Sequence, residues 1–226
     1  MEHIDDTSID ILETHQNYNN KGKEVESNFV PKKESKFKRY FDVVTSTILL
    51  VISLPVFLIV SLLIKFTSKG PIFFVQERLG KNRVPFNLYK FRTMVPNAEK
   101  NTGPVWASED DPRITPIGQF LRTSRIDELP QLFNVIKGEM SIVGCRPIRQ
   151  HFADLLAEEI PSYNFRFVIK PGLTGLAQVR DNYANTKQAQ RRKLRYDILY
   201  IRRRNFYLDI KILLLTLLIP FKSMGL

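Results

Sequence analysis

The sequence contains little of the material that several common protein classes need. It has one cysteine, Cys145, in 226 residues, which excludes an internal disulfide framework. The histidines are His3, His15 and His151, too few and too scattered for a zinc-type cluster of cysteine and histidine ligands. A GxSxG nucleophile elbow, a phosphate-binding P-loop and a Rossmann glycine fingerprint are also absent. Any chemistry must therefore use carboxylates and basic groups.

Charge is distributed unevenly along the chain. The whole carries +11, from 34 Lys and Arg against 23 Asp and Glu. Residues 1–30 hold seven acids and two bases, a net −5, so the remainder carries +16. A basic body suggests an anionic partner: nucleic acid, a phosphorylated substrate or anionic lipid. None of the usual groove-reading or base-stacking modules is visible, so we expect no nucleic-acid partner.

The acidic, Asn-rich start of the chain has neither the basic n-region nor the apolar core of a signal peptide. Its low hydrophobicity and acidic excess are typical of segments that do not bury enough apolar surface to fold. We therefore predict a poorly ordered acidic tail over residues 1–35.

One apolar run is long enough to cross a membrane. Val43–Ile64 contains 22 consecutive uncharged residues, and a straight helix of that length spans about 33 Å against a hydrocarbon core of about 30 Å. Positive residues near a membrane segment prefer the cytoplasmic side, and here they stand at both ends. They are Lys32, Lys33, Lys36, Lys38 and Arg39 before the run and Lys65, Lys69, Arg78, Lys81 and Arg83 after it.

The middle of the run contains a helix breaker. Pro55 has no amide donor and kinks a helix, and the nearby Ser53 is placed to satisfy a freed carbonyl. Together with the basic flanks, this predicts a bent, re-entrant membrane anchor over residues 36–66. A kinked single span with the tail outside remains the alternative, because proline is tolerated in spanning helices.

Residues 67–226 are predicted to form a cytoplasmic catalytic domain of short elements. Strand-like pieces occupy Ile72–Val75 and Phe86–Phe91, and helical patterns cover about 115–123, 125–137, 149–159 and 185–204. The last helix is basic and amphipathic, typical of a solvated face or of a helix on an anionic bilayer. Phe206–Phe221 is apolar but contains Asp209 and Lys211, which favours an interface-lying helix. The predicted fold class is mixed α/β, mostly helical and monotopic, with amphipathic surface helices.

The best candidate for chemistry is the acid pair Asp127-Glu128 at the start of a helical pattern. A structural explanation exists, because Ser124 to Asp127 matches a helix capping box and acids in a first turn are stabilised by the helix dipole. The functional explanation is that a helix start, with Arg122 and Arg125, attracts a phosphate beside the carboxylates. Adjacent residues lie about 100° apart around a helix, which suits separate roles, one as nucleophile and one as metal ligand.

The acid pair belongs to a series of motifs that lie along the chain on both sides of it. They are Lys38-Arg39-Tyr40-Phe41-Asp42, Gly70-Pro71-Ile72-Phe73-Phe74-Val75-Gln76-Glu77-Arg78-Leu79-Gly80, Tyr89-Lys90-Phe91-Arg92-Thr93-Met94, Asp127-Glu128-Leu129-Pro130-Gln131-Leu132, Gly138-Glu139-Met140-Ser141, Arg146-Pro147 and Pro171-Gly172-Leu173-Thr174-Gly175-Leu176-Ala177-Gln178-Val179. With the first of these motifs before the membrane segment and the others after it, the chain resembles the bacterial sugar transferase family over about residues 36–221. These are polyprenyl-phosphate hexose-1-phosphate transferases, or monotopic phosphoglycosyl transferases, that begin capsule, O-antigen and exopolysaccharide synthesis.

The resemblance implies a two-step, ping-pong reaction. Asp127 would attack the sugar-linked phosphate of a UDP-sugar, release UMP and hold the phosphosugar until undecaprenyl phosphate takes it. Glu128 would hold Mg²⁺ as the cofactor. The implied location is the bacterial inner membrane, with the catalytic domain on the cytoplasmic face. Substrate contacts are expected from Lys90, Arg92, Arg122, Arg146, Gly172, Thr174 and Gln178. The implied partners are UDP-sugar, polyprenyl phosphate and anionic membrane lipid, and a homo-oligomer is left open.

Three positions depart from the family's usual pattern. Leu54 separates Ser53 from Pro55, where a Ser-Pro pair is common. Cys145 stands where many members have proline, and Leu176 stands where many have tryptophan. These departures affect local loop geometry and not the expected reaction.

Two other functions are compatible with the residues. A non-catalytic membrane-surface adaptor would use Asp127 and Glu128 as helix caps and bind anionic lipid through its basic helices. A metal-dependent glycosyltransferase would use Glu109-Asp110-Asp111 and release UDP, although Pro112 favours a surface loop there. No residue identifies the sugar.

Overall fold

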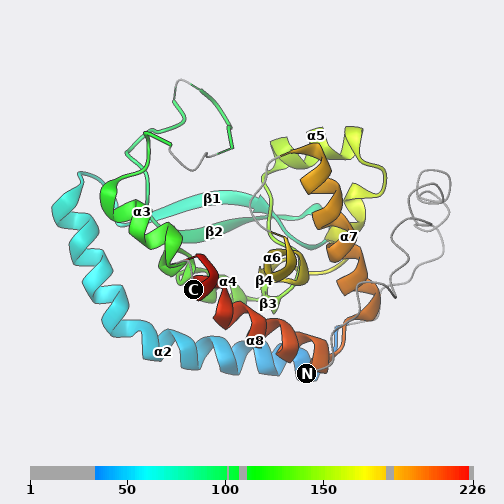
Figure 1. Cartoon of the computed structure of the whole chain (residues 1–226). Helices are drawn as coiled ribbons and strands as arrows, with labels where there is room; N and C mark the ends of the chain where they lie inside the picture. Colours follow the sequence, from blue (N-terminus) through cyan, green and yellow to red (C-terminus); the bar gives the residue numbers. More distant parts are fainter. Residues whose placement is uncertain (1–33, 101, 107–110, 182–185, 224–226) are drawn as a thin grey trace.

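The computed structural model describes residues 34–100, 102–106, 111–181 and 186–223, which form a mostly helical fold with two small sheets (Figure 1). The tail predicted for residues 1–35 lies outside these residues except for its last two. The elements are α2 (Lys36–Thr67), β1 (Phe73–Leu79), η2 (Lys81–Arg83), β2 (Pro85–Phe91), α3 (Pro116–Thr123), η3 (Ile126–Glu128), α4 (Gln131–Lys137), β3 (Ser141–Val143), α5 (Gln150–Glu159), η4 (Tyr163–Val168), β4 (Gly172–Thr174), α6 (Leu176–Arg180), α7 (Lys187–Arg203) and α8 (Phe206–Ser223), where η marks a 3₁₀ turn.

The apolar run forms most of α2, one continuous helix of 32 residues. Ser35 caps its start by accepting a hydrogen bond from the Lys38 amide at 3.0 Å. Among the helices that the structure describes, only α2 is long and apolar enough to cross a membrane, and only 17% of its most apolar window is buried. Ile52, Leu58 and Phe66 are 68%, 63% and 83% exposed. Because large exposed apolar surfaces mark contact sites, α2 is compatible with a membrane anchor.

Pro55 lies inside α2, and in Figure 1 the helix changes direction along its length. Proline has no amide to donate, so the carbonyl four residues earlier, that of Val51, loses its helical partner. The Ser53 hydroxyl donates instead to the carbonyl of Leu50 at 3.0 Å. Ser53 therefore supports the residue before the freed carbonyl, which differs from the role expected for it.

The strands β1 and β2 form an antiparallel hairpin, which confirms the two predicted strand segments and extends the first to Leu79. Phe73 pairs with Phe91 in the register. Asn82 in the connecting turn has φ of 55°, a left-handed conformation that asparagine tolerates well. The hairpin places Lys90, next to the end of β2, beside the acid pair.

The strands β3 and β4 form a parallel pair in which Ser141 is opposite Gly172. Gly172 lies so close to the backbone that follows β3 that a Cβ on it would be 2.1 Å from the amide nitrogen of Gly144. Only glycine permits this approach. The Gly172 amide donates to the carbonyl of Cys145 at 2.8 Å, so Gly172 supports the backbone that carries Arg146.

Three of the four predicted helices are confirmed as α3, α5 and α7, but the continuous helix expected over residues 125–137 is wrong. The chain forms η3 and then α4, with Pro130 as the N-terminal cap of α4. Proline lacks an amide donor and has a fixed φ, so it begins a new helix more easily than it continues one.

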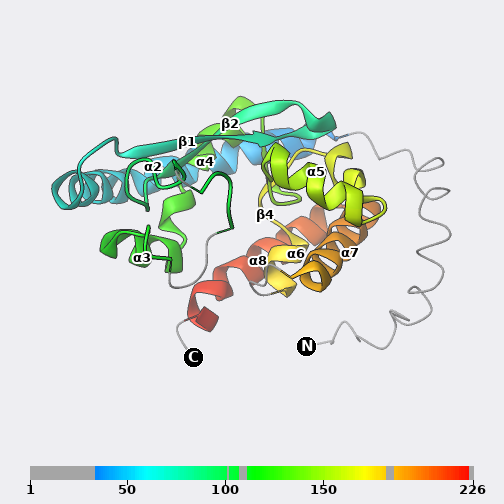
Figure 2. The same cartoon turned by 90° about the horizontal axis from the view of Figure 1, so that it is seen from above.

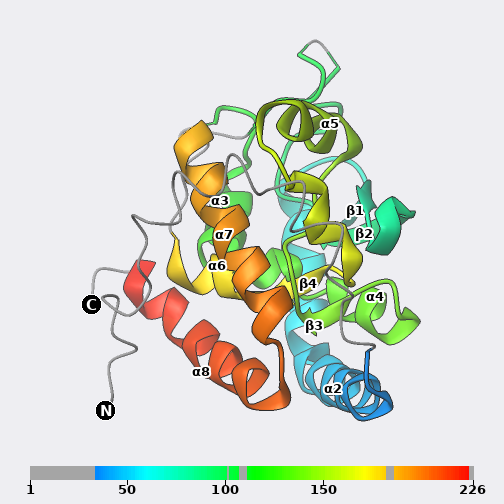
Figure 3. The same cartoon turned by 90° about the vertical axis from the view of Figure 1, so that its right-hand side faces the viewer.

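The two C-terminal helices pack on the core and on the start of α2. In α7, Leu194 and Ile198 are buried while Arg191 and Arg202 are exposed. The ring of Phe206, at the start of α8, lies 5.0 Å from that of Phe37 in α2. Figure 3 shows α2 and α8 along the same side of the molecule.

Asp209 does not form a polar surface on α8, although its charge suggested one. Its side chain is buried, and Lys38 Nζ lies 2.8 Å from Asp209 Oδ2. The Tyr200 hydroxyl donates to Asp209 Oδ1 at 2.7 Å. Because a buried charge is costly unless it is paired and hydrogen-bonded, this network joins α2, α7 and α8 at one point.

Candidate active site

The acid pair lies between two layers of the fold. Figure 2 shows α2, the hairpin and α4 on one side and α6, α7 and α8 on the other. A cleft of about 870 Å³ is lined by residues from both layers, including Lys90 of β2, Gln178 of α6 and Lys193 of α7. This volume is in the range of clefts that bind small molecules and cofactors.

The turn that presents the acids is built differently from a capping box. Ser124 ends α3, and its hydroxyl donates to the Phe120 carbonyl at 2.8 Å instead of capping the following turn. Arg125 then adopts φ of 62°, which reverses the chain into η3. The capping-box explanation of Ser124 and Asp127 is therefore wrong, and the geometry leaves both acids available for another role.

Asp127 is 5% exposed and only partly satisfied. Its Oδ2 lies 3.5 Å from Lys90 Nζ, while Oδ1 is buried without a hydrogen-bond partner among the described residues. Burial raises the pKa of Asp127 above its ordinary value; the charge of Lys90 opposes this shift and that of Glu128 adds to it.

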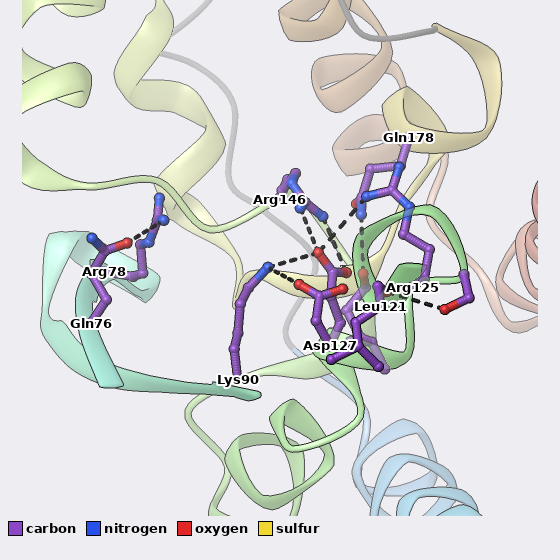
Figure 4. Close-up of polar contacts among 11 residues, drawn as sticks. Gln76, Arg78, Lys90, Leu121, Arg125, Asp127, Arg146 and Gln178 are labelled. Atoms are coloured by element: carbon purple, nitrogen blue, oxygen red, sulfur yellow. Dashed lines mark hydrogen bonds and ion pairs between the residues drawn. The ribbon is translucent and has the colours of Figure 1, made fainter. Parts of the chain in front are cut away.

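Glu128 has the opposite environment. Its Oε1 lies 2.6 Å from Arg146 Nη2 and 2.9 Å from Lys90 Nζ, and Arg125 Nη1 lies 3.9 Å away. Burial alone would raise the pKa of Glu128, but Arg146 and Lys90 hold it well below its ordinary value. The cations therefore fix Glu128 as a carboxylate, whereas Asp127 keeps an oxygen without a partner among the described residues. Figure 4 shows Lys90 reaching toward Asp127.

Six of the residues expected in the site line this one cleft: Lys90, Arg92, Arg122, Asp127, Arg146 and Gln178. Arg122 Nη1 is buried and has no hydrogen-bond partner among the described residues. Gln178 donates to the Leu173 carbonyl at 3.0 Å, and its Oε1 is likewise buried without a partner in the described part of the chain. Buried groups of this kind are rare without a ligand, water or ion to satisfy them.

Three expected contacts lie in different settings. Arg92 borders the cleft, but its guanidinium donates to the Ser68 and Lys69 carbonyls at 2.9 and 2.8 Å, at the end of α2. Thr174 Oγ1 lies 2.7 Å from Thr216 Oγ1 of α8, and neither Thr174 nor Gly172 lines the cleft. The geometry of these three residues favours a structural role.

Several cleft residues were not among the site residues expected from the sequence. Arg166 forms a buried ion pair with Asp197 at 3.0 Å and donates to the Arg146 carbonyl at 2.9 Å. Arg78 and Arg149 line the same cleft. Arg78 was visible in the Gln-Glu-Arg motif and Arg149 stands three residues after Arg146 in a stretch that suggested anion binding, but no spacing rule places residue 78 in the same cleft.

A metal site would have to be completed by the substrate. The described residues contain no group of three or more His, Cys, Asp or Glu side chains able to hold a metal ion. Mg²⁺ commonly uses one or two carboxylates together with substrate phosphates, and Glu128, next to Asp127 in η3, is the carboxylate expected to hold it. Since Lys90 and Arg146 already contact Glu128, Mg²⁺ fits best when it arrives with a diphosphate.

The alternative metal-dependent glycosyltransferase is tested by the structure only at Asp111, one of its three expected acids. Glu109 and Asp110 lie outside the described residues, and Asp111 is paired with Arg113 at 2.5 Å. The arginine lowers the pKa of Asp111 to about 2 through hydrogen bonding to its side chain. This pairing occupies the carboxylate that the alternative requires.

Comparisons with known proteins agree with the family resemblance of the sequence. The family model described as "Bacterial sugar transferase" matches residues 33–223. A UDP-N-acetylgalactosamine-undecaprenyl-phosphate N-acetylgalactosaminephosphotransferase of Aeromonas hydrophila is 41% identical over 80% of this chain and 42% of its own length. A UDP-glucose:undecaprenyl-phosphate glucose-1-phosphate transferase of Klebsiella pneumoniae is 39% identical over 80% of this chain and 39% of its own length. The chain thus spans about two fifths of these two relatives.

A shorter relative matches along most of its length. The exopolysaccharide production protein PSS of Rhizobium leguminosarum bv. phaseoli is 40% identical over 78% of this chain and 90% of its own length.

Proposed function

The chain belongs to the bacterial sugar transferase family, and we propose that it transfers a sugar-1-phosphate from a UDP-sugar to polyprenyl phosphate through a covalent intermediate on Asp127. The observation that carries this proposal is the buried Oδ1 of Asp127, which has no partner among the described residues and lies in a cleft whose charged side chains are mostly cations. The names of the relatives support the class of substrates, a nucleotide sugar and undecaprenyl phosphate.

In the first step an oxygen of Asp127 attacks the phosphorus that bears the sugar. The bond from this phosphorus to the bridging oxygen breaks, UMP leaves with the electron pair, and an acyl phosphate to the sugar forms. In the second step an oxygen of polyprenyl phosphate attacks the same phosphorus. The aspartyl oxygen leaves, Asp127 becomes a carboxylate again, and the product is a polyprenyl diphosphate sugar.

The cations of the site have two roles in this scheme. Arg146 and Lys90 hold Glu128, and Lys90 also reaches Asp127, so the nucleophile is kept in place before substrate binds. Arg122, with a buried donor that lacks a partner in the described residues, is suited to a phosphate oxygen. Mg²⁺, held by Glu128 together with the diphosphate, would neutralise charge on the phosphates.

The membrane position follows from α2 and the charge of the chain. The exposed apolar side chains of α2 suit a bilayer, and the basic residues at both of its ends favour one side, the cytoplasmic one. We therefore propose a re-entrant anchor in the inner membrane with the cleft on the cytoplasmic face, where nucleotide sugar and lipid phosphate meet. The reaction would be the first membrane step of capsule, O-antigen or exopolysaccharide synthesis, and the Rhizobium relative is named an exopolysaccharide production protein.

The direct test uses the full chain in detergent or nanodiscs with a panel of UDP-sugars. A ping-pong enzyme releases UMP stoichiometrically without lipid acceptor and exchanges labelled UMP into the matching UDP-sugar. Adding undecaprenyl phosphate then makes UMP release catalytic. Release of UDP would indicate a glycosyltransferase, and binding of anionic vesicles with no nucleotide release from any donor would indicate the adaptor.

A further inference from the structure

The cleft extends beyond the acid pair into an arm that the reaction scheme has not used. Arg146, Arg78, Arg149, Phe152 and Trp106 all line it. Their contacts give an order: Arg146 binds Glu128, the Arg149 guanidinium lies 5.7 Å from the Phe152 ring centre, and the Trp106 ring stacks on Phe152 at 3.9 Å. We call these five residues the arginine-tryptophan arm.

Arg78 is the least satisfied cation of this arm. It donates to Gln76 Oε1, its Nε is buried without a partner, and among the described residues no carboxylate lies within ion-pair distance. Burial together with the charges of Arg146 and Arg149 lowers the pKa of Arg78 to about 10. It therefore stays protonated at neutral pH. Figure 4 shows Arg78 and Gln76 set apart from the group around Asp127 and Lys90.

The rest of the arm is held rigidly. Arg149 makes a two-pronged contact with Glu99, at 2.7 and 2.9 Å. Trp106 is 42% exposed although one of its faces stacks on Phe152 at an interplanar angle of 22°. A stacked aromatic pair with an open face is a platform for a planar ring, because any base presents a π-face to it.

In-line displacement determines which half of the donor this arm receives. In phosphoryl transfer the attacking and leaving oxygens lie on opposite sides of the phosphorus. When Asp127 attacks, the leaving nucleotide must extend away from Asp127. The contacts of the arm begin with Arg146 at Glu128, continue through Arg78 and Arg149, and end at the Phe152 and Trp106 rings. A nucleoside monophosphate has the same order of groups, phosphate first and base last.

We infer that the arginine-tryptophan arm is the subsite for the nucleoside monophosphate half of the donor, with Arg78 binding the phosphate that leaves and Trp106 stacking on the base. This inference rests on the proposed function and assigns its leaving-group site. Gln76 positions Arg78 through their hydrogen bond.

The chain provides its own probe, because Trp106 is its single tryptophan. Titrating UMP into the full chain in detergent, without donor or lipid, should change Trp106 fluorescence in a saturable way. In Arg78→Gln the Kd for UMP should rise about tenfold or more, the loss expected for a charge-assisted hydrogen bond. Arg78→Lys should fall between the two, since lysine keeps the charge but not the planar fork.

The controls separate this contact from general effects. Arg202→Gln removes one positive charge from an exposed position on α7 outside the cleft, and it should leave the Kd for UMP unchanged. Uridine, which has no phosphate, should bind more weakly than UMP and with equal affinity to wild type and Arg78→Gln. Equal melting temperatures of the variants establish that each is folded. If Arg78→Gln is unstable, Trp106→Phe tests the base contact instead, with its UMP binding measured by equilibrium dialysis.

The outcomes also separate this inference from the proposed function. Suppose that the wild type releases UMP from a UDP-sugar, and that Arg78→Gln and Trp106→Phe bind UMP as tightly as the wild type. The arm is then not the nucleotide subsite, and the proposed function stands. If UMP binds through Arg78 but no donor yields UMP, the subsite stands and the proposed reaction is wrong.

Discussion

Arg146 Nη2 lies 2.6 Å from Glu128 Oε1, while the neighbouring Asp127 keeps one buried oxygen without a partner among the described residues. Two adjacent acids thus have different electrostatic states. The pKa of Glu128 is held well below its ordinary value by Arg146 and Lys90 against its burial, whereas burial raises that of Asp127. Such a divergence between neighbouring titratable groups is how proteins assign different roles to the same side-chain type.

Asp127→Asn should abolish UMP release from UDP-sugar, a loss of about a thousandfold or more, because an amide cannot form the acyl phosphate. Glu128→Gln should reduce the rate too, yet still permit labelling of Asp127 by a phosphosugar. Mass spectrometry of the chain after incubation with donor alone checks both variants. Full activity in Asp127→Asn would refute the nucleophile assignment.

The same substitution makes a prediction for stability. Since the pKa of Asp127 is raised in the folded state, the folded protein binds this proton more tightly than the unfolded chain. Asp127 therefore favours folding below its folded-state pKa and loses that contribution as pH rises through it. The melting temperature of Asp127→Asn relative to wild type should rise between pH 4 and pH 7. A difference that is constant with pH would contradict the raised pKa.

Lys90 should control the acid limb of the pH–rate profile. A carboxylate nucleophile must be ionised, so activity falls as pH drops through the pKa of Asp127, and Lys90 lowers that pKa. Lys90→Met should move the acid limb to higher pH and reduce the rate about a hundredfold, as loss of one preorganised electrostatic contact does. Lys90→Arg should restore the position of the limb. An unshifted limb in Lys90→Met would rule out this coupling.

Arg92 should matter for stability more than for substrate affinity. It is 5% exposed, and its guanidinium donates to the end of α2 through Ser68 and Lys69. Arg92→Gln removes hydrogen bonds from a charged donor, each worth about 1.5–3 kcal/mol, so the melting temperature should fall while KM for the UDP-sugar stays within about twofold. A large rise in KM at unchanged melting temperature would show that Arg92 binds substrate.

Magnesium should bind together with the nucleotide. Lys90, Arg146 and Arg125 surround the acid pair, and this positive environment disfavours a bare divalent cation until a diphosphate adds negative charge. Mg²⁺ alone should therefore leave the melting temperature unchanged, and Mg²⁺ with UDP-sugar should raise it more than UDP-sugar alone. EDTA should stop UMP release. Tight Mg²⁺ binding to the free protein would contradict this order.

The re-entrant anchor predicts that both ends of α2 lie on the same side of the membrane. Cys145 is buried, and burial raises the pKa of its thiol well above the ordinary value, so it should not react with an impermeant maleimide. Ser8→Cys and Lys69→Cys introduce one accessible thiol before and one after α2. Neither should label in intact cells, and both should label after the membrane is opened. Labelling of Ser8→Cys in intact cells would favour the single span.

Much of the fold follows from local patterns in the chain. Val43–Ile64 predicted α2 because an uncharged run of 22 residues needs an apolar environment. Helical spacing predicted α3, α5 and α7, and β-rich segments predicted the hairpin. Local rules failed at residues 125–137, where the left-handed Arg125 and the imino group of Pro130 divide one expected helix into two.

The site shows the boundary between sequence and tertiary structure most clearly. The sequence by itself determined the acid pair, the membrane segment and the order of the motifs, because each depends on neighbours in the chain. Only the tertiary structure decided that Lys90 and Arg146 bind Glu128 and leave Asp127 free, and that Arg92 supports α2. These contacts join residues 18 to 38 positions apart, and both the desolvation and the Coulomb energies that set the two pKa values depend on distances that folding alone creates.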